Sequence, residues 1–305
     1  MVQRVSILVS TFNGAKYLSE QLDSLVAQTY KNKKIRVRDD GSTDESRQIL
    51  AKYAEQYSCF RVEFGNYLGI SQSFFSLLSL ADKGSRYFAF CDQDDVWHAD
   101  KIERAVTRLS GISSDTPAIY CSRLRYVGKD LSTLGESGMP RRGASFQNAL
   151  VENVAIGCTM VMNRAARDLI AKSLPAQCVW HDWWCYLVVS AFGIVVYDEY
   201  PTIKYRLHGE NNTGAAVSLW GQFRRRIRRF ALKGREAFSI HAQAVEFAAL
   251  FAGRLPASKL EILNRLVESK RSVFKRVGYA LNPGVYRQSR LDGFLLRVFV
   301  ILDRY

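Results

Sequence analysis

Hydrophobic and polar positions in the N-terminal part of the chain switch repeatedly between a strand pattern and a helix pattern. Residues 5–12 form a near-continuous apolar run that ends at Asn13-Gly14, which predicts a strand buried on both faces. Leu18, Leu22 and Leu25 then recur at helical spacing. Further strands are expected at residues 34–38, 61–64 and 87–91, with helices expected after Thr43 and over residues 74–80. This alternation predicts an α/β fold with a doubly wound, parallel sheet.

Polar residues follow three of these expected strands, at Thr11 to Asn13, at Asp39-Asp40 and at Asp92 to Asp95. Ligands of such sheets bind outside the carboxyl ends of the strands, so we expect these three clusters to meet at one edge. Asp39-Asp40-Gly41 also fits an ordinary turn, and both interpretations stay open. The chain has neither a Gly-x-Gly-x-x-Gly nor a Walker-type loop, which disfavours dinucleotide and P-loop chemistry.

The acidic run is the strongest chemical signal. Asp92, Asp94 and Asp95 place three carboxylates within four residues, directly after an apolar strand. Like charges this close repel each other, and burying them without partners is costly. A divalent cation relieves the repulsion, and oxygen ligands suit Mg²⁺ or Mn²⁺, which commonly also hold phosphates. The alternative is a solvated acidic turn.

Composition adds a cellular setting. The chain has 305 residues of which 48% are hydrophobic, enough for one large α/β domain and an extra module. No apolar stretch reaches the roughly 18 residues of a spanning helix, and the N-terminus leads directly into a strand, which argues against a signal peptide. The six cysteines are scattered without a Cys-x-x-Cys pair, as expected of reduced thiols in the cytosol.

The positive charge is concentrated at the C-terminal end. Residues 219–305 hold 18 lysines and arginines against 6 aspartates and glutamates, a net charge of +12, whereas residues 1–218 carry +2. Residues 219–233 place aromatic and apolar side chains at helical spacing among five arginines, which favours a peripheral contact with an anionic membrane. A solvated helix face is the alternative, and nucleic-acid binding is disfavoured. Residues 294–302 are apolar but too few to span a bilayer.

Six segments in order along the chain resemble the family 2 glycosyltransferases of the GT-A fold, especially bacterial rhamnosyltransferase-like members that build surface polysaccharides. They cover residues 3 to about 214 and are Ser6–Asn13, Arg38–Asp44, Phe90–Trp97, Asn153–Met160, Trp180–Trp184 and Tyr205–Asn212. The resemblance implies a Rossmann-like, mixed and mainly parallel sheet with flanking helices. It implies a catalytic domain over residues 1–215, and residues 216–305 are expected to form a basic helical module.

The same resemblance implies roles on the donor side. Thr11 and Asn13 would line the nucleotide pocket, Asp39 would meet the base, and Gly69 would belong to the loop near the donor. Asp92 and Asp94 would form the Asp-x-Asp motif that handles ribose, diphosphate and metal.

On the reaction side, Asp95 would adjoin that motif, and Asp94 and His208 would hold the metal. Asp182 would be the catalytic base. The residue before it is a histidine where the family usually has glutamate, which leaves the acceptor surroundings less defined. A residue at a helix start is the alternative interpretation of Asp182.

Two neighbouring patterns have plainer explanations. Trp183 and Trp184 fit the buried face of a helix, although tryptophans here could also line an acceptor site. Cys178, His181 and Cys185 lack the fourth ligand that zinc sites usually have.

Together these features predict an inverting, metal-dependent hexosyltransferase. The sugar, with rhamnose from a dTDP donor as the first expectation, would pass from a nucleoside-diphosphate donor to a lipid-linked glycan acceptor of a surface polysaccharide. The protein would lie peripherally on the cytoplasmic face of the inner membrane and bind no nucleic acid. The alternatives are a UDP-hexose-dependent enzyme of the same fold and a catalytically silent sugar-nucleotide-binding or scaffold protein.

Overall fold

The computed structural model describes residues 2–207 and 240–305, and these divide into two compact units. Unit 1 comprises the described residues within 1–139, 155–172 and 193–214. Unit 2 comprises the described residues within 140–154, 173–192 and 215–305. The domain limits of 1–215 and 216–305 stay a prediction.

A seven-stranded sheet forms the centre of unit 1, in the order β10-β6-β9-β4-β1-β2-β3. Strand β9 is antiparallel to its neighbours β4 and β6, and the other four pairings are parallel. The expected mixed, mainly parallel sheet is therefore confirmed. Its strands are β1 (Val5–Thr11), β2 (Lys33–Asp39), β3 (Phe60–Phe64), β4 (Tyr87–Cys91), β6 (Ala118–Ser122), β9 (Val161–Asn163) and β10 (Ile194–Asp198).

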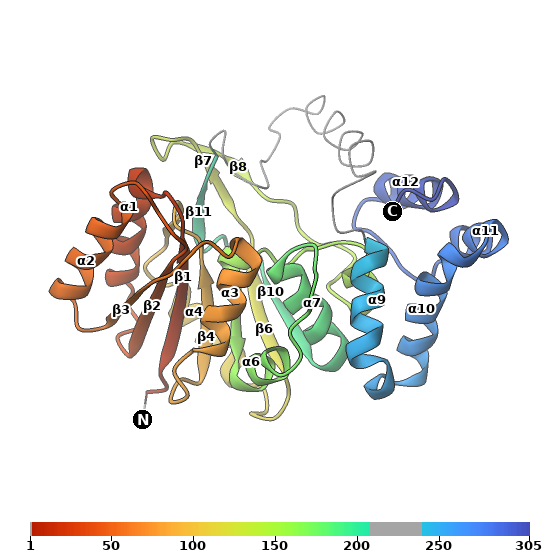
Figure 1. The fold of residues 1–305 in the computed structure, drawn as a ribbon, viewed down its shortest axis with the longest axis horizontal. Helices are drawn as coiled ribbons and strands as arrows, with labels where there is room; N and C mark the ends of the chain where they lie inside the picture. Colours follow the sequence, from red (N-terminus) through yellow and green to blue (C-terminus); the bar gives the residue numbers. More distant parts are fainter. Residues whose placement is uncertain (1, 208–239) are drawn as a thin grey trace. The chain divides into compact units, whose positions relative to one another are not determined.

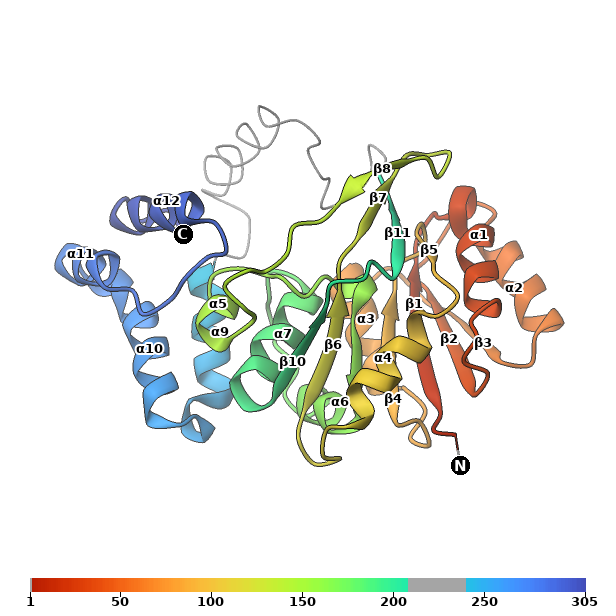
Figure 2. The ribbon, with the colours of Figure 1, turned by 180° about the vertical axis from the view of Figure 1, so that it is seen from behind.

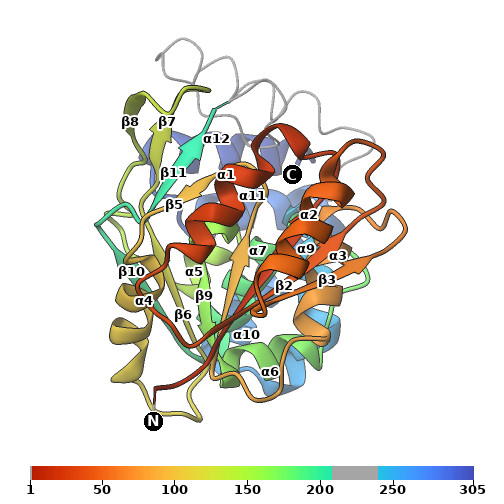
Figure 3. The same cartoon turned by 90° about the vertical axis from the view of Figure 1, so that its left-hand side faces the viewer.

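Helices cover both faces of this sheet, as Figures 1 and 2 show from opposite sides. Alternate residues of β1 point to opposite faces, so Val5, Ile7 and Val9 share one core cluster with residues of α1, α2 and α4. Ser10, from the other set of positions, bonds Ser73 of α3. Figure 3 shows α1 and α2 side by side. The helices of unit 1 are α1 (Ala15–Val26), α2 (Ser46–Gln56), α3 (Ile70–Ser79), α4 (Lys101–Ser110) and α6 (Arg164–Ala171), with a short 3₁₀ turn, η1 (Gly157–Thr159).

The first four predicted strands are confirmed, and the predicted helices are found with shifted starts. Helix α2 begins at Ser46 rather than next to Thr43, and α3 begins at Ile70, four residues before the expected start. Gly69 precedes α3 with a φ of 83°, so the backbone turn and not the apolar pattern sets where that helix begins.

A second, four-stranded sheet belongs to the same unit and lies beyond the carboxyl ends of the central strands (Figure 2). Its order is β5-β11-β7-β8. Strand β5 starts directly after Asp95, and its partner β11 ends at Arg206, so this sheet brings residues far apart in the sequence next to the acidic run. The strands are β5 (Val96–Trp97), β7 (Arg125–Val127), β8 (Thr133–Glu136) and β11 (Ile203–Arg206).

Unit 2 is helical among its described residues. Helix α7 is almost entirely buried, in keeping with its apolar sequence on every side, and the Trp184 ring lies 5.9 Å from the Phe247 ring of α9. Lys259 of α10 donates to the carbonyl of Ala191 near the C-terminus of α7. The helices are α5 (Phe146–Ala149), α7 (His181–Phe192), α9 (Ile240–Phe251), α10 (Ala257–Glu268), α11 (Val273–Leu281) and α12 (Arg290–Ile301), with 3₁₀ turns η2 (Ala252–Arg254) and η3 (Ser269–Arg271).

No helix within residues 2–207 and 240–305 combines the length and the apolar character needed to cross a bilayer. Residues 219–233, for which the sequence predicts a membrane contact, lie outside the described residues.

Gly193, directly before the edge strand β10, allows a test of how closely the backbone packs there. A Cβ atom there would lie 1.9 Å from the main-chain oxygen of Pro117, which accepts a hydrogen bond from Ile194 at the start of β10. We expect Gly193→Ala to lower the free energy of unfolding by about 1–3 kcal/mol, because backbone on both sides must shift. Urea denaturation followed by circular dichroism measures this.

Gly111→Ala is the matched control. Gly111 ends α4 with a φ of −79°, and a Cβ there would meet open space among the described residues. That variant should be unchanged or about 0.4–1 kcal/mol more stable, because alanine restricts the unfolded chain. Equal stability of the two variants would contradict the close approach at Gly193.

Candidate active site

The polar clusters predicted at the strand ends do meet at one edge of unit 1. Strand β1 lies between β2 and β4, parallel to both, with Thr11 opposite Asp39 and Val9 opposite Cys91. The carboxyl ends of the three strands are therefore adjacent. This brings Thr11, Asn13, Asp39, Gly69, Asp92, Asp94 and Asp95 to the same end of the sheet.

Gln93, which separates the first two aspartates of the acidic run, connects that run to the end of β1. Its Oε1 accepts hydrogen bonds from the Thr11 hydroxyl at 2.7 Å and from the Phe12 amide at 2.8 Å. Its Nε2 donates to the Phe12 carbonyl at 3.1 Å. This side chain therefore fixes one strand end against the other. Sequence reasoning passed over Gln93, although its place between two candidate ligands was the available signal.

Asn13 joins β1 to the loop after β2. Its φ is 48°, and its amide donates to the Ser42 hydroxyl while its Oδ1 accepts from the Thr43 amide at 2.8 Å. The left-handed backbone that asparagine tolerates turns the chain here. Asn13 thus shapes the rim of the edge with both its main chain and its side chain.

Asp39 and Asp40 are both buried but differ in what their oxygens contact. Asp39 Oδ1 accepts from the Ser42 amide at 3.1 Å and from Arg47 Nε at 2.7 Å. Asp39 Oδ2 is buried and has no hydrogen-bond partner among the described residues. A buried carboxylate oxygen without a donor is costly, so this atom is a candidate for a ligand N–H or O–H.

Asp40 serves the fold. Its Oδ1 accepts from the Leu68 amide and its Oδ2 from the Gly69 amide, both at 2.8 Å. It also forms a buried ion pair with Arg38, which in turn donates to the Asn66 carbonyl. Asp40 therefore holds the loop that contains Gly69 against the end of β2. For this residue the turn-like interpretation is the better one.

The acidic run is packed more tightly than a solvated turn. Asp95 is fully buried, and burial together with the charges of Asp94 and Asp92 raises the pKa of its carboxyl group well above the usual value. Asp92 and Asp94 are half-buried. Ligand atoms of Asp92, Asp95 and Cys158 all lie within 4.8 Å of one another, and among the described residues this is the one such group that could hold a cation. The solvated-turn alternative does not describe this site.

The donor set has a mixed character. Two carboxylates suit Mg²⁺ or Mn²⁺, which prefer oxygen. The thiol is a poorer fit, because burial raises the pKa of Cys158 well above its usual value and keeps the proton on the sulfur. The residues present thus fit a hard cation held by oxygens, with Cys158 as a buried neighbour.

Two buried cations lie around the acidic run. Arg206, at the end of β11, donates through Nε to the Asp94 carbonyl at 3.0 Å, and its amide donates to Asp95 Oδ1 at 3.2 Å. Its guanidinium also pairs with Glu20 and stacks 4.4 Å from the Tyr17 ring centre. The sequence motif around residue 205 contained Arg206, yet its role was not predicted, because its partners lie more than 100 residues away.

Lys101 is the second cation. It is fully buried at the start of α4, with its ammonium 4.5 Å from the centre of the Trp97 ring. Burial lowers the pKa of Lys101 to about 8, while the neighbouring Cys158, Cys91 and Asp95 act in the opposite direction. A positive charge close to the carboxylates partly offsets their repulsion.

Asp182 belongs to unit 2, where it lies in the first turn of α7. It is 9% exposed, and its Oδ1 accepts from the Trp183 amide at 2.7 Å. Trp183 and Trp184 are buried, and the Trp183 indole donates to the Ala149 carbonyl, so their prediction as a helix's buried face is confirmed. His208 lies outside the described residues.

Cys178, His181 and Cys185 do not form a group that could hold a cation among the described residues. The six cysteines form no disulfide among the described residues. Burial lowers the pKa of His181 to about 3, so the imidazole beside Asp182 is neutral at physiological pH.

Residues 6–169 match the sequence model of the family described as glycosyl transferase family 2. The matched segment contains the three strand ends and the acidic run. The chain belongs to this family. It is accordingly a nucleotide-sugar-dependent glycosyltransferase of the EC 2.4 class.

Two relatives illustrate the similarity. A glycosyltransferase of Rickettsia typhi is 27% identical over 237 residues, which cover 73% of this chain and 72% of that protein. The dTDP-rhamnosyl transferase RfbG of Shigella flexneri is 26% identical over 229 residues, covering 71% of this chain and 77% of that protein.

Solved structures share the GT-A fold at low identity. Staphylococcus aureus TarS residues 1–349 in complex with UDP-GlcNAc has a TM-score of 0.58 and 17% identity, covering 98% of this chain and 81% of that one. The mannosyltransferase PcManGT of Pyrobaculum calidifontis, in complex with GDP-Man and Mn²⁺, has a TM-score of 0.54 and 18% identity, covering 100% of this chain and 81% of that one.

Asp40 can be tested as a structural residue. Asp40→Ala removes the partner of Arg38, which has a side chain only 6% exposed, and leaves that charge without its counter-ion. We expect the free energy of unfolding to fall by about 3–5 kcal/mol, as for other buried pairs that lose one member. Urea denaturation provides the measurement. Glu63→Ala, an exposed carboxylate on β3, should change stability by less than about 0.5 kcal/mol, and similar losses in both would refute the assignment.

Proposed function

We propose that the protein is an inverting, metal-dependent transferase that moves a sugar from a nucleoside diphosphate to a hydroxyl group of a glycan acceptor. The supporting observation is the cluster of Asp92, Asp94 and Asp95 at the end of β4, in the same edge as the buried Asp39 carboxylate. The catalytic domain is proposed to comprise residues 1–215, followed by a helical module over residues 216–305.

The donor would bind across the ends of β1 and β2. Asp39 Oδ2, buried without a described partner, would accept a hydrogen bond from a base N–H or a ribose hydroxyl. Thr11 and Asn13 would line this nucleotide pocket, and Gly69 would bring its loop close to the donor. The exposed rings of Phe12 and Tyr67 have their centres 5.0 Å apart at the same edge and offer a further apolar surface for a base.

The diphosphate would bind at the acidic run together with Mg²⁺ or Mn²⁺. The ligands proposed from the sequence are Asp94 and His208, and Asp92 and Asp95 are the described carboxylates close enough to share a cation. The Mn²⁺ in the PcManGT complex supports a metal in this fold. When bound, such an ion would offset the charge that develops on the departing diphosphate.

Asp182 is proposed as the general base. The acceptor oxygen would attack C1 of the sugar as its proton passes to the Asp182 carboxylate, and the bond between C1 and the diphosphate oxygen would break. One base without a second carboxylate nucleophile corresponds to a single displacement, which inverts the configuration at C1. Asp182 lies in the first turn of α7, where its Oδ1 accepts a hydrogen bond from the Trp183 amide.

For the donor we propose rhamnose on dTDP, because RfbG carries that activity in its name. A UDP-hexose is the alternative, supported by the UDP-GlcNAc complex of TarS. The acceptor would be a lipid-linked glycan of a surface polysaccharide. The enzyme would then work peripherally at the cytoplasmic face of the inner membrane, attracted by its basic C-terminal part. A catalytically silent scaffold remains the contrasting hypothesis.

A metal requirement is the first test of this proposal. Chelation should abolish release of nucleoside diphosphate from the matching sugar nucleotide, and Mn²⁺ or Mg²⁺ should restore it. Asp92→Asn, Asp94→Asn and Asp95→Asn should each lower turnover, at least about 100-fold for a direct ligand, because charge compensation on the leaving group is lost. A coupled assay for the released diphosphate measures this.

Asp115→Asn is the control for the acidic run, since it removes an exposed carboxylate from another loop of unit 1. Turnover of each of the three variants is then measured against metal concentration. The variant that needs the largest increase in metal concentration for half-maximal turnover identifies the direct ligand. Full activity in the chelator would refute the metal requirement, and an absence of turnover with every sugar nucleotide would favour the scaffold.

Asp182→Asn tests the base. Turnover should fall by about 10²–10⁴-fold, the usual contribution of a positioned base, while donor affinity by calorimetry stays unchanged. Glu261→Gln, which neutralises an exposed carboxylate of unit 2, should keep full activity. Normal turnover of Asp182→Asn would remove this residue from the mechanism.

A further inference from the structure

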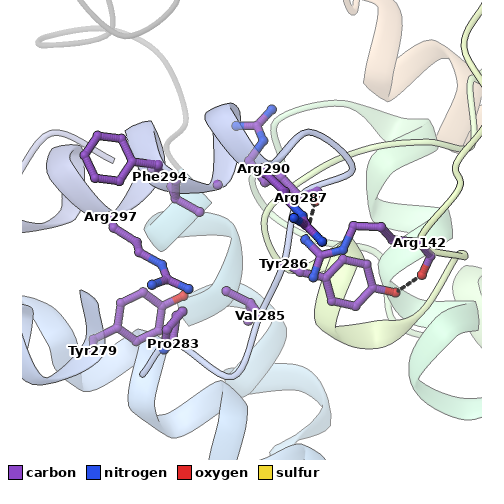
Figure 4. A pocket seen from close by; sticks show the side chains of 11 residues that line it. Arg142, Tyr279, Pro283, Val285, Tyr286, Arg287, Arg290, Phe294 and Arg297 are labelled. Carbon is purple, nitrogen blue, oxygen red and sulfur yellow. Dashed lines mark hydrogen bonds between the residues drawn. The ribbon is translucent and has the colours of Figure 1, made fainter. Parts of the chain in front are cut away.

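Unit 2 contains a cavity of about 290 Å³ that is rich in arginine (Figure 4). Residues from the segment before α5, from α11, from the loop between α11 and α12 and from α12 line it, and all of them belong to this one unit. The side chains that matter here are Arg142, Arg287, Arg290, Arg297, Tyr279 and Tyr286. Four guanidinium groups around one cavity predict an anionic occupant.

Most of this positive charge is uncompensated. Arg287 is 3.7 Å from Glu152, whose other oxygen accepts from the Gln288 amide. Arg142, Arg290 and Arg297 have no carboxylate partner among the described residues. Crowded arginines repel one another unless an anion lies between them, so the wall of this cavity favours a bound anion.

The arginines of the cavity differ in how many contacts hold their side chains in place. Arg142 donates to the Arg287 carbonyl at 2.8 Å and stacks 4.5 Å from the centre of the Tyr286 ring. The Tyr286 hydroxyl in turn donates to the Arg142 carbonyl at 2.9 Å. Arg290 and Arg297 lie one heptad apart on α12, so they share one helix face. A planar guanidinium can offer two parallel N–H donors to a phosphate.

Tyr279 supplies an independent sign of a ligand. Its ring lines the cavity, the residue is 3% exposed, and its hydroxyl has no hydrogen-bond partner among the described residues. Burial raises the pKa of Tyr279, so the hydroxyl keeps its proton and can donate. Figure 4 shows the side chain of Arg297 beside Tyr279. A buried donor next to an unpaired arginine matches an oxyanion.

Large apolar side chains are exposed on the two helices that form this cavity. Phe274 of α11 is 89% exposed and Phe294 of α12, which lies between Arg290 and Arg297 on one helix face, is 61% exposed. Leu281 and Leu291 are also exposed. Phe294 itself lines the cavity. Exposed apolar residues among arginines are typical of helices that lie in the headgroup region of a membrane.

We propose that this cavity binds the phosphate group of an anionic phospholipid, with the exposed apolar side chains of α11 and α12 in the membrane interface. The phospholipid fits better than a free anion, because a free anion would leave Phe274 and Phe294 without an apolar partner. The segment that supplies most of the cavity is basic, since residues 240–305 hold 11 lysines and arginines against five aspartates and glutamates. The proposal deepens the membrane association proposed above and names its site.

The experiment is flotation of the full-length protein with two kinds of vesicle, phosphatidylcholine alone and phosphatidylcholine mixed with phosphatidylglycerol. The wild type should float with the second kind and much less with the first. Arg290→Gln/Arg297→Gln should weaken that partition at least about tenfold. Equal flotation with both kinds of vesicle would overturn the proposed anionic phospholipid, because phosphatidylcholine carries a phosphate but no net charge.

Two further variants separate the cavity from general attraction. Arg290→Lys/Arg297→Lys keeps both charges but loses the planar guanidinium groups with their parallel N–H donors. If the cavity binds the phosphate, partition into the vesicles should fall several-fold; if only net charge attracts the protein, partition should not change. Tyr279→Phe removes only the hydroxyl and should also weaken partition. Lys52→Gln/Arg61→Gln, the matched control on the exposed surface of unit 1, changes net charge equally and should partition as the wild type. Full partition of the double lysine variant would overturn the proposal.

Inorganic phosphate distinguishes a lipid from a free anion. At matched ionic strength, phosphate should displace the wild type from the vesicles more strongly than chloride does. Calorimetric binding of phosphate without any flotation would assign the cavity to a free anion instead and overturn the lipid contact. All variants should keep metal-dependent turnover on a water-soluble acceptor, so that loss of flotation is distinguishable from failure of the proposed transferase activity.

Discussion

Crowding of three carboxylates at the end of β4 is the constraint on which the rest of the site depends. Asp95 is fully buried beside Asp92 and Asp94, and such a group is stable only if protons, donors or cations compensate it. The chain supplies part of this compensation itself, through Arg206 at the end of β11 and the buried ammonium of Lys101. The second sheet brings Arg206 next to the run, because β11 pairs with β5 directly after Asp95. A divalent cation fits what remains.

At the end of the neighbouring strand β2, the adjacent residues Asp39 and Asp40 have different roles. Asp40 uses both oxygens on amides of the following loop and pairs with a buried arginine, so its carboxylate is committed to holding that loop. Asp39, the last residue of β2, leaves one buried oxygen without a described donor. Asp40, the first residue after the strand, holds the loop, whereas Asp39 keeps an oxygen available for a ligand.

The local pattern of apolar and polar residues predicted the local elements of the fold. The apolar runs and the helical spacing identified the first four strands and the parallel arrangement, and from it the shared edge of Thr11, Asp39 and Asp92. Gln93 and Arg206 were not predicted as supports, because their roles depend on partners that only the folded chain brings close, whereas a turn role for Asp40 was one of two open interpretations. Arg206 reaches Asp94 across 112 positions of sequence. The antiparallel β9 was missed for the same reason, since a three-residue strand carries too little periodicity to reveal its partners.

The two places proposed to bind phosphate groups, the acidic edge of unit 1 and the arginine-rich cavity of unit 2, use different chemistry. This difference would determine which phosphate each one accepts. Bare arginines attract any phosphate, including those of lipids and free nucleotides, and they therefore suit an abundant membrane headgroup. Carboxylates repel phosphate until a cation lies between them, so the edge of unit 1 would accept a diphosphate only together with its metal. If both proposals hold, arginines in unit 2 and carboxylates in unit 1 would let one chain bind two different anions at separate places. The positive charge is concentrated in residues 219–305, which carry +12 against +2 for residues 1–218.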